Sequence, residues 1–388
     1  MGRLRFLTAG ESHGSEIVAL IEGAPAGIPV LATDINAELA RRQRGYGRGG
    51  RMRIEHDQVR LTAGVRGGET IGGPIAMVIT NHDHKNWAAH MTDAPFEHTP
   101  HPVTRPRPGH ADLAGGLKYD RHDLRDILER ASARETAART AAGALCKRLL
   151  GLVGIEIFGH VVSIGTVEAN VAALPLEELR KRALEADLSC ADPVAEEAMR
   201  DTIREAAHAG DTVGGVFEIV AMGAPPGLGS HVSWDRKLDG RIAQGLMSIQ
   251  GIKGIEIGAA FDATRRRGST LHDPIFYNAA EKAFTRPSNA AGGVEGGITN
   301  GMPVRVRAAM KPIATLKRAL PSIDVTTKEP NDAAFERSDV CAVAAASVVG
   351  EAMLAFVLAD ALLEKFGGDS VAELRRNVVG YLDQIRRY

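Results

Sequence analysis

The sequence predicts an α+β fold in which helices pack against antiparallel β-sheets. Much of the chain consists of short β-branched segments separated by turns rich in glycine and proline, and strong helical patterns are few. The strands do not alternate regularly with helices, which argues against a parallel βαβ sheet. In addition, the pattern V-x-G-G-x-T-x-G-x-P-[IV] occurs at residues 65–75 and again at 294–304, each time before a strand-like segment. This duplication indicates two similar sheets.

The first two predicted strands, "LRFLTA" and "EIVALIE", are joined by "GESHG" at residues 10–14. This loop matches G-x-S-x-G, the turn that carries the nucleophile of many serine hydrolases. In those enzymes a helix follows the serine, whereas here the next segment is β-branched and stops at Pro25. Ser12 and His13 also point to opposite faces of an extended chain, so they are poorly placed as nucleophile and base. We therefore expect a polar site loop instead of a nucleophile turn.

Three regions have helical patterns. "SARETAARTAAGALCKRLL" begins with Ser132 and Glu135, which form a predicted capping box. Residues 174–208 read as two charged surface helices. "DVCAVAAASVVGEAMLAFVLADALLEKF" is apolar nearly all round, which predicts a buried helix with Asp339 as its N-cap. We expect a single domain over residues 1–388, with the charged helices as a surface excursion.

Bulk composition excludes several classes of protein. The formal net charge of the 388 residues is -1, so no overall field favours nucleic acid or membrane. The three cysteines lie far apart with no disulfide or metal spacing, and the first residues lack a signal-peptide pattern. The most apolar stretch, residues 340–363, is interrupted by acidic residues. These features predict a cytoplasmic protein.

Most of the 47 basic residues are arginines, and six of them lie in "ARRQRGYGRGGRMR" at residues 40–53, which has no acidic residue. The match to G-x-G-x-x-G at residues 45–50 follows a helical segment, so it does not fit a dinucleotide fingerprint. An RNA-binding Arg/Gly segment, a solvated loop, or a cationic loop that closes over an anionic ligand would each fit the residues. The balanced charge and an aromatic content of 4% favour the anionic ligand.

Seven of the thirteen histidines lie between residues 82 and 122. The H-x-H pattern at residues 82–84 could begin a metal site, and a His-dependent metal hydrolase is therefore an alternative function. No H-E-x-x-H or C-x-x-C motif supports it. His110 stands beside Arg105 and Arg107 in a loop held by proline and glycine, where it would suit a general acid acting on a bound phosphate. A solvent-exposed loop histidine explains the segment equally well.

Further polar residues cluster in short motifs with the character of anion sites. "LERASARET" places basic and hydroxyl groups at a capped helix N-terminus, and "AMKPIATL" and "FERSDV" add others. Each motif alone has an ordinary explanation as a cap or a surface charge. Together they predict a phosphorylated or multiply anionic small molecule as ligand. The residues concerned are Arg130, Ser132, Arg134, Lys311, Thr315, Arg337 and Asp339.

The motifs, taken in order, resemble those of the chorismate synthase family almost end to end. They are "GESHG", "RRQRGYGRGGRM", "RPGHADL", "RASARETA", "SIQGIKGIEIG", "GGVEGGITNGMP", "KPIATL" and "RSDV". The resemblance implies a helical layer sandwiched between two antiparallel sheets, which agrees with the internal pseudo-repeat suggested by the duplicated turn. It also implies a homotetramer.

The same resemblance implies the reaction. The family converts 5-enolpyruvylshikimate 3-phosphate to chorismate, the last common step of aromatic amino acid biosynthesis, by a 1,4-elimination of phosphate. The reaction requires reduced FMN without net redox change. The motifs do not distinguish an enzyme that reduces its flavin with NADPH from one that uses an external reductant. The implied partner is a small-molecule substrate, with no nucleic acid, membrane or metal.

The family's functional positions map onto this sequence as expectations. His13 resembles the histidine at the leaving phosphate, His110 the one that sets the protonation of reduced flavin, and Asp339, with Ser12 as a relay, the group that keeps flavin N5 basic. The substrate- or NADP-binding candidates are Arg42, Arg48, Arg107, Arg134 and Arg337. The FMN-binding candidates are Arg130, Ala131, Ser132, Gln250, Gly251, Gly296, Lys311, Pro312, Ile313, Ala314, Thr315 and Arg337. Gln250 and Gly251 stand where the family often has another amide residue and alanine.

Overall fold

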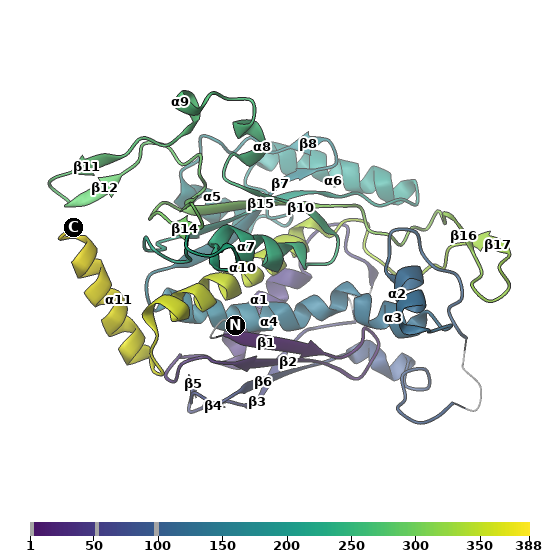
Figure 1. The fold of residues 1–388 in the computed structure, drawn as a ribbon. Coiled ribbons are helices and arrows are strands. Elements are labelled where there is room, and N and C mark those ends of the chain that lie inside the picture. The colour runs from purple at the N-terminus through teal and green to yellow at the C-terminus, as the bar shows by residue number, and fades with distance from the viewer. Residues whose placement is uncertain (1–3, 51–53, 97–100) are drawn as a thin grey trace.

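The computed structural model describes residues 4–50, 54–96 and 101–388. Its first sheet has four strands, each antiparallel to its neighbour (Figure 1). Alternate residues of the central strand, such as Ile17 and Ile21, are almost fully buried, as expected of a sheet with one face on the core. In spatial order the strands are β1 (Arg5–Ala9), β2 (Glu16–Glu22), β6 (Ile75–Thr80) and β3 (Val59–Ala63).

The second sheet has five strands, also antiparallel throughout. Its central strand is continuous and almost entirely buried, because the core covers one face and the charged excursion covers part of the other. In spatial order the strands are β10 (Ile252–Ile257), β15 (Val304–Met310), β9 (Gly215–Met222), β7 (Glu156–Ile164) and β8 (Val167–Glu168). The excursion itself consists of α5 (Leu176–Glu185) and α6 (Pro193–His208), as the charge pattern predicts.

Helices α4 (Thr136–Gly151) and α10 (Val343–Phe366) pack against each other, α4 also against β2 and β6 and α10 against β7 and β9 (Figure 1). Small residues allow this close approach: a Cβ built on Gly143 would lie 2.2 Å from the Cβ of Ala352. Within the described part of the chain, α10 is the one helix long and apolar enough to cross a membrane, but 94% of its most apolar window is buried inside the protein. It is a core helix, as its all-round apolar pattern predicts.

The duplicated turn forms two short hairpins with matching contacts. In the hairpin β4 (Val65–Arg66) and β5 (Glu69–Thr70), Thr70 Oγ1 donates to Pro25 O at 2.6 Å and accepts from Ile28 N at 2.9 Å. In the hairpin β13 (Val294–Glu295) and β14 (Ile298–Thr299), Thr299 Oγ1 makes the same pair of bonds at 2.7 and 2.8 Å. Their partners there are the Pro225 carbonyl and the Leu228 amide. The first hairpin precedes β6 of the first sheet and the second precedes β15 of the second sheet.

Two predicted helix starts are wrong. Asp339 is not the N-cap of α10, which begins only at Val343 with Ala342 as its N-cap, because the carboxylate of Asp339 is engaged by other groups. The predicted capping box at Ser132 instead caps a short 3-10 helix, Ala133–Glu135, and α4 begins after it at Thr136. The Glu135 carboxylate bonds Arg139 instead of returning to the Ser132 amide.

The remaining elements are short or peripheral, apart from α1, α7 and α11. These elements are α1 (Ala32–Gln43), η2 (His82–Asn86), α2 (Asp112–Tyr119), α3 (Arg125–Ala131), η3 (Ala133–Glu135), η4 (Trp234–Arg236), α7 (Leu238–Met247), α8 (Ala260–Ala263), α9 (Gly268–Leu271), β11 (Phe276–Asn278), β12 (Ala283–Thr285), β16 (Pro321–Ile323), β17 (Pro330–Asp332) and α11 (Val371–Ile385).

Candidate active site

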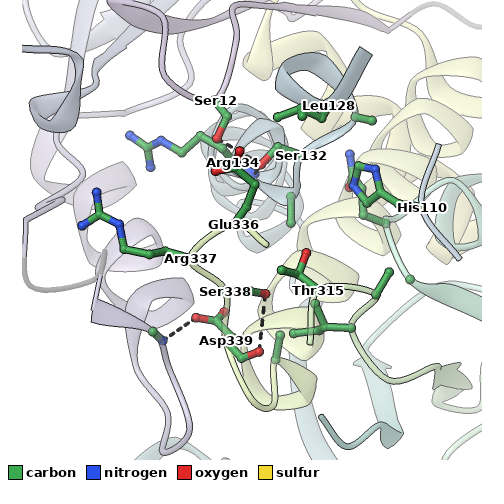
Figure 2. Close-up of a pocket in the computed structure, with 18 of the residues that line it drawn as sticks. Ser12, His110, Leu128, Ser132, Arg134, Thr315, Glu336, Arg337, Ser338 and Asp339 are labelled. Carbon is green, nitrogen blue, oxygen red and sulfur yellow. Dashed lines mark hydrogen bonds between the residues drawn. The ribbon is translucent and has the colours of Figure 1, made fainter. Parts of the chain in front are cut away.

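A cavity of about 370 Å³ collects segments that are far apart in the sequence (Figure 2). Its volume is in the range typical of small-molecule sites. The structure brings nearly all the predicted site residues into its lining. They are Ser12, His13, Arg42, Arg48, Arg107, His110, Ala131, Ser132, Arg134, Gln250, Gly251, Lys311, Pro312, Ile313, Ala314, Thr315, Arg337 and Asp339.

Two predicted residues do not line this cavity. The guanidinium of Arg130 donates to the carbonyl of Thr8 at 2.8 Å and that of Gly10 at 3.2 Å, and thereby ties α3 to the end of β1. Gly296 lies at the turn of the β13–β14 hairpin with a φ of 60°, a left-handed conformation that favours glycine. A structural role therefore explains the contacts of Arg130 and the conformation of Gly296 in this structure.

The loop "GESHG" is fixed from two sides. The Ser12 amide donates to the Glu129 carbonyl at 3.0 Å, and Asn81 Nδ2 donates to the Gly14 carbonyl at 2.7 Å. The Ser132 hydroxyl donates to the Ser12 hydroxyl at 3.1 Å, whereas His13 is engaged by Glu129. Serine and histidine therefore have different partners, and the strand β2 follows instead of a helix, as predicted for a site loop.

His13 is held by a carboxylate and an aromatic ring. Its Nδ1 lies 2.8 Å from Glu129 Oε1, and its backbone amide donates to Glu129 Oε2 at 2.8 Å. The Trp87 ring stacks on the imidazole with centroids 4.2 Å apart. Burial alone would raise the pKa of Glu129, but the hydrogen bonds from His13 and the charge of Arg125 outweigh it and lower the pKa.

His110 is held within its own loop. Its Nδ1 lies 2.5 Å from Asp112 Oδ1, and the same carboxylate accepts from Arg107 Nε at 2.8 Å and Nη2 at 3.0 Å. Arg107 also donates to Thr315 Oγ1 at 2.9 Å. Burial opposes ionisation of Asp112, but the hydrogen bonds from His110 and Arg107 prevail and hold its pKa well below the ordinary range.

Two buried arginines share one buried carboxylate. Asp57 accepts from Arg42 Nη2 at 2.5 Å and from Arg134 Nη1 at 2.6 Å, while Arg134 Nε donates to Asn81 at 2.7 Å. Burial tends to raise the pKa of Asp57, yet the two cations lower it overall. Among the described residues, Arg42 Nε has no hydrogen-bond acceptor, whereas Arg134 Nη2 lies 3.7 Å from the buried carboxylate of Glu55. A buried donor such as Arg42 Nε is costly unless a ligand supplies an acceptor, so it favours a bound anion.

Asp339 faces the arginine-rich loop instead of a helix N-terminus. Its Oδ1 accepts from the Gly49 amide at 2.6 Å, and its Oδ2 lies 3.0 Å from Arg48 Nε (Figure 2). Arg48 Nη1 also donates to the Arg42 carbonyl at 3.1 Å. These bonds join the loop after α1 to the segment before α10. Residues 51–53, the end of the arginine-rich motif, lie outside the described residues.

The opposite wall is built from the end of β15 and the segment after it. The Lys311 amide donates to the Gly251 carbonyl at 2.9 Å, and the Lys311 ammonium donates to the Gly109 carbonyl. Gln250 Nε2 donates to Glu135 at 3.1 Å, and its Oε1 has no donor within the described part of the chain. These bonds hold the backbone of this wall in place and fix the Gln250 side chain against Glu135.

Sequence reasoning missed the residues that support the others. Asp57, Asn81 and Glu129 lie far in the sequence from the site residues that they bond, so spacing does not show these pairings, whereas Asp112 shares a short motif with His110. Trp87 was missed as well, and no motif indicates it. Other lining residues not predicted are Gly49, Gly50, Asp83, Gly109, Ala111, Leu128, Ala133, Met310, Glu336, Ser338 and Ala342.

The H-x-H pattern does not form a metal site. Within residues 4–50, 54–96 and 101–388, no three His, Cys, Asp or Glu side chains come together in a way that could hold a metal ion. His84 Nδ1 instead lies 2.9 Å from the His13 carbonyl, behind the loop. This geometry gives no support to the metal hydrolase alternative.

The fold and the cavity define an enzyme that acts on a small anionic molecule, because buried guanidiniums, two carboxylate-held histidines and an aspartate meet in one pocket. A family model described as chorismate synthase matches residues 4–363. Chorismate synthases of Desulforudis audaxviator and Pelobacter propionicus are 57% and 56% identical to the chain over 99% of its length, covering 98% and 99% of their own. A solved structure titled "Crystal Structure of Chorismate Synthase" is similar with a TM-score of 0.80 and 45% identity, covering 99% of both chains. The chain belongs to the chorismate synthase family and is a carbon–oxygen lyase.

Proposed function

We propose that the chain removes phosphate and a ring proton from 5-enolpyruvylshikimate 3-phosphate in a 1,4-elimination that gives chorismate, with reduced FMN in the same cavity. Family membership supports the reaction. The observation that carries it in this chain is a cavity lined by Arg42, Arg107 and Arg134, each held by a buried carboxylate, beside two carboxylate-held histidines. A substrate with two carboxylates and a phosphate suits guanidiniums that are oriented in this way.

The arginines bind and orient the substrate. Arg42, Arg107 and Arg134 are each fixed by a buried carboxylate, so their guanidiniums are already oriented when the anion arrives. Burial, together with repulsion from Arg134 and Arg48, lowers the pKa of Arg42 despite the attraction of Asp57. An entering anion relieves this repulsion. Arg48 and Arg337 complete the proposed substrate- or NADP-binding set, and Arg337, with its side chain 60% exposed, stands at the entrance.

His13 protonates or hydrogen-bonds the leaving phosphate. The C–O bond breaks with its electron pair on the phosphate oxygen, so a donor at that atom lowers the barrier, typically by a factor of about 10²–10⁴ in rate. The Nδ1 atom of His13 faces Glu129, so Nε2 is the ring nitrogen through which it would act. Reduced FMN, when bound, supplies electron density to the allylic centre and a basic N5 for the ring proton.

His110, Asp339 and Ser12 manage protons near the flavin. We assign to His110 the control of flavin protonation, and to Asp339, with Ser12 as a relay, the basicity of N5. Arg48 and the Gly49 amide contact Asp339, in place of the helix N-terminus that the sequence suggested. The Ser132 hydroxyl donates to the Ser12 hydroxyl at 3.1 Å, and this hydrogen bond holds the Ser12 side chain in place for the proposed relay.

The flavin would lie against the wall formed by Ala131, Ser132, Gln250, Gly251 and the segment Lys311–Thr315. These residues line the cavity and carry peptide and amide groups, which suit the hydrogen-bonding groups of an isoalloxazine. Arg337 lies at the entrance, where it could contact the FMN phosphate. Arg130 and Gly296 stay in the proposed FMN set on the family resemblance alone, because neither lines the cavity.

The decisive experiment is an anaerobic assay of purified protein with the substrate and reduced FMN. We expect phosphate and chorismate to form in equal amounts, and only when reduced FMN is present. Normal turnover without flavin, or no turnover with it, would refute the proposal. A companion assay in air with NADPH and FMN alone distinguishes an enzyme that reduces its own flavin from one that needs an external reductant.

Assembly, location and architecture are also proposals. We propose a cytoplasmic homotetramer of single-domain chains, each with a helical layer sandwiched between two related sheets. The matched threonine bonds of the β4–β5 and β13–β14 hairpins support the internal pseudo-repeat, because the same side chain closes the same turn in both places. Sedimentation of the purified protein tests the tetramer.

A further inference from the structure

Glu129 is a buried carboxylate that does not line the cavity yet contacts a residue that does. It lies on α3, one position before Arg130, and its side chain is 2% exposed. A buried carboxylate is costly unless it is paired and hydrogen-bonded. Its main partner is the loop that carries His13, from which it is separated by 116 residues of sequence.

The contacts of Glu129 fix this loop at three atoms. One carboxylate oxygen accepts from the His13 amide at 2.8 Å, the other lies 2.8 Å from His13 Nδ1, and the Glu129 carbonyl accepts from the Ser12 amide. An ionised carboxylate is only an acceptor, so the proton of a neutral imidazole must be on Nδ1. The other nitrogen, Nε2, is then the acceptor in the neutral ring and the donor in the charged one.

The face of the imidazole is fixed as well. Trp87 stacks on His13, and Arg125 lies over the same indole with its guanidinium carbon 4.8 Å from the ring centroid. Arg125 also donates to Glu129 at 3.1 Å, and His84 holds the His13 carbonyl at 2.9 Å. Ring rotation would therefore break a carboxylate contact and an aromatic contact together. This is the kind of support that catalytic histidines require.

We propose that Glu129 is a positioning residue, whose carboxylate fixes the ring orientation and the tautomer of His13 so that Nε2 is presented to the leaving phosphate. The inference rests on the proposed function, because it assigns a support to the residue placed at the phosphate. Glu129 does not touch the substrate, and its effect passes entirely through His13.

The test is a double-mutant cycle in the anaerobic assay with reduced FMN and 5-enolpyruvylshikimate 3-phosphate. Glu129→Gln keeps the size of the side chain and removes the charge. We expect kcat to fall about tenfold to a hundredfold, which is part of the usual contribution of a general acid, while KM and the Kd for FMN change little. In the His13→Ala background, Glu129→Gln should change kcat by less than about twofold, because the two residues act as one unit.

A matched control is available in the second sheet. Glu218 is another buried glutamate that pairs with a histidine, since its Oε1 lies 3.1 Å from His160 Nε2, and it does not line the cavity. Burial opposes its ionisation, but His160 and Arg305 lower the pKa of Glu218 to about 2. Glu218→Gln should therefore lower thermal stability without changing kcat, which shows the effect of losing a buried Glu–His pair elsewhere.

The outcomes separate the two proposals. If Glu129→Gln keeps the wild-type kcat while His13→Ala loses it, the positioning role is refuted and the proposed function stands. If His13→Ala keeps the wild-type kcat, the role of His13 fails and the positioning role fails with it. If the effects of Glu129→Gln and His13→Ala on kcat are additive, the role of Glu129 is purely structural and the inference is overturned. The same conclusion follows if Glu129→Gln lowers the affinity for FMN as much as it lowers kcat. If Glu129→Gln does not fold, Glu129→Asp retains the charge but withdraws it from Nδ1, and the same cycle applies.

Discussion

His13 with Glu129 forms one corner of the cavity, and His110 with Asp112 and Arg107 forms another. In each corner the Nδ1 atom of the histidine lies next to a buried carboxylate, but the two corners are built differently. Asp112 is two residues from His110 and is shared with Arg107, so a single short segment carries histidine, carboxylate and guanidinium. Glu129 comes from a separate helix and binds both the ring and the backbone of His13. The His110 arrangement lies within one short segment that includes the guanidinium of Arg107. The His13 arrangement forms only after α3 has packed against the loop at residues 10–14.

This difference indicates a division of labour. At the His110 corner the carboxylate is largely committed to Arg107, whose guanidinium makes two bonds to it and whose backbone amide makes a third, while the guanidinium also donates to Thr315. At the His13 corner Arg125 makes one bond to Glu129 and has a second acceptor in Glu336. In the proposed reaction, the His13 pair would therefore be better suited to proton transfer, and the His110 group to holding a fixed charge distribution near the proposed flavin.

The largest expected effect comes from removing the imidazoles. His13→Ala should lower kcat by about 10²–10⁴, the usual contribution of a general acid, with unchanged FMN affinity. His110→Ala should lower kcat less and should alter the absorbance of bound reduced FMN, because its proposed role concerns the flavin. Anaerobic phosphate release and FMN titration measure both. If the two variants lose kcat equally and have the same spectrum of bound reduced FMN, the separate roles proposed for His13 and His110 are wrong.

A second effect concerns stability. Asp112→Asn leaves the buried guanidinium of Arg107 without its carboxylate, and breaking such a pair typically costs about 3–5 kcal/mol. Glu129→Gln should cost less, because Arg125 retains Glu336 and the amide can still accept from the His13 backbone. Urea unfolding of the two variants and wild type gives the comparison. A greater loss of stability for Glu129→Gln would show that the fold depends more on the Glu129–His13 pair than on the Asp112–Arg107 pair.

The smallest effect is the response to acid. Asp112 and Glu129 both have a lowered pKa in the folded protein, so the unfolded chain binds more protons below their ordinary pKa values of about 4. Their contribution to stability is thus present above about pH 4 and is lost as the pH falls through the folded values. Melting curves between about pH 6 and 3 should show a Tm that declines, and Asp112→Asn and Glu129→Gln should each flatten the decline. A decline of equal steepness in all three proteins would contradict this origin.

The sequence predicted the helices and strands better than it predicted the residues at which the helices begin. The strands around "GESHG", the buried helix α10 and the surface helices α5 and α6 follow from periodicity and from proline and glycine placement. The starts of α4 and α10 were wrong, because Ser132 caps a 3-10 turn and Asp339 bonds the arginine-rich loop. In both places a long-range partner competes with the local cap, and local rules contain no information about it.

The site was predictable in its residue types and not in its pairings. Motifs in the order of a known family identified the cavity-lining residues, including His13 and the distant segment Lys311–Thr315. Spacing could not reveal that Asp57 lies beneath Arg42 and Arg134, or that Glu129 reaches His13. Those pairs join residues that only tertiary packing brings together. The exception is His110 with Asp112, which share one short motif.

The cavity is walled by stretches from the beginning, the middle and the end of the chain, from Ser12 to Ala342. A molecule bound there contacts all of them at once, and so acts as a reversible cross-link between parts of the fold that would otherwise separate on heating. Ligand occupancy and thermal resistance are consequently linked, with a gain of about 2.7 kcal/mol at a concentration one hundred times the Kd. If the proposed flavin and substrate bind there, their concentrations would set the thermal stability of the enzyme as well as its rate.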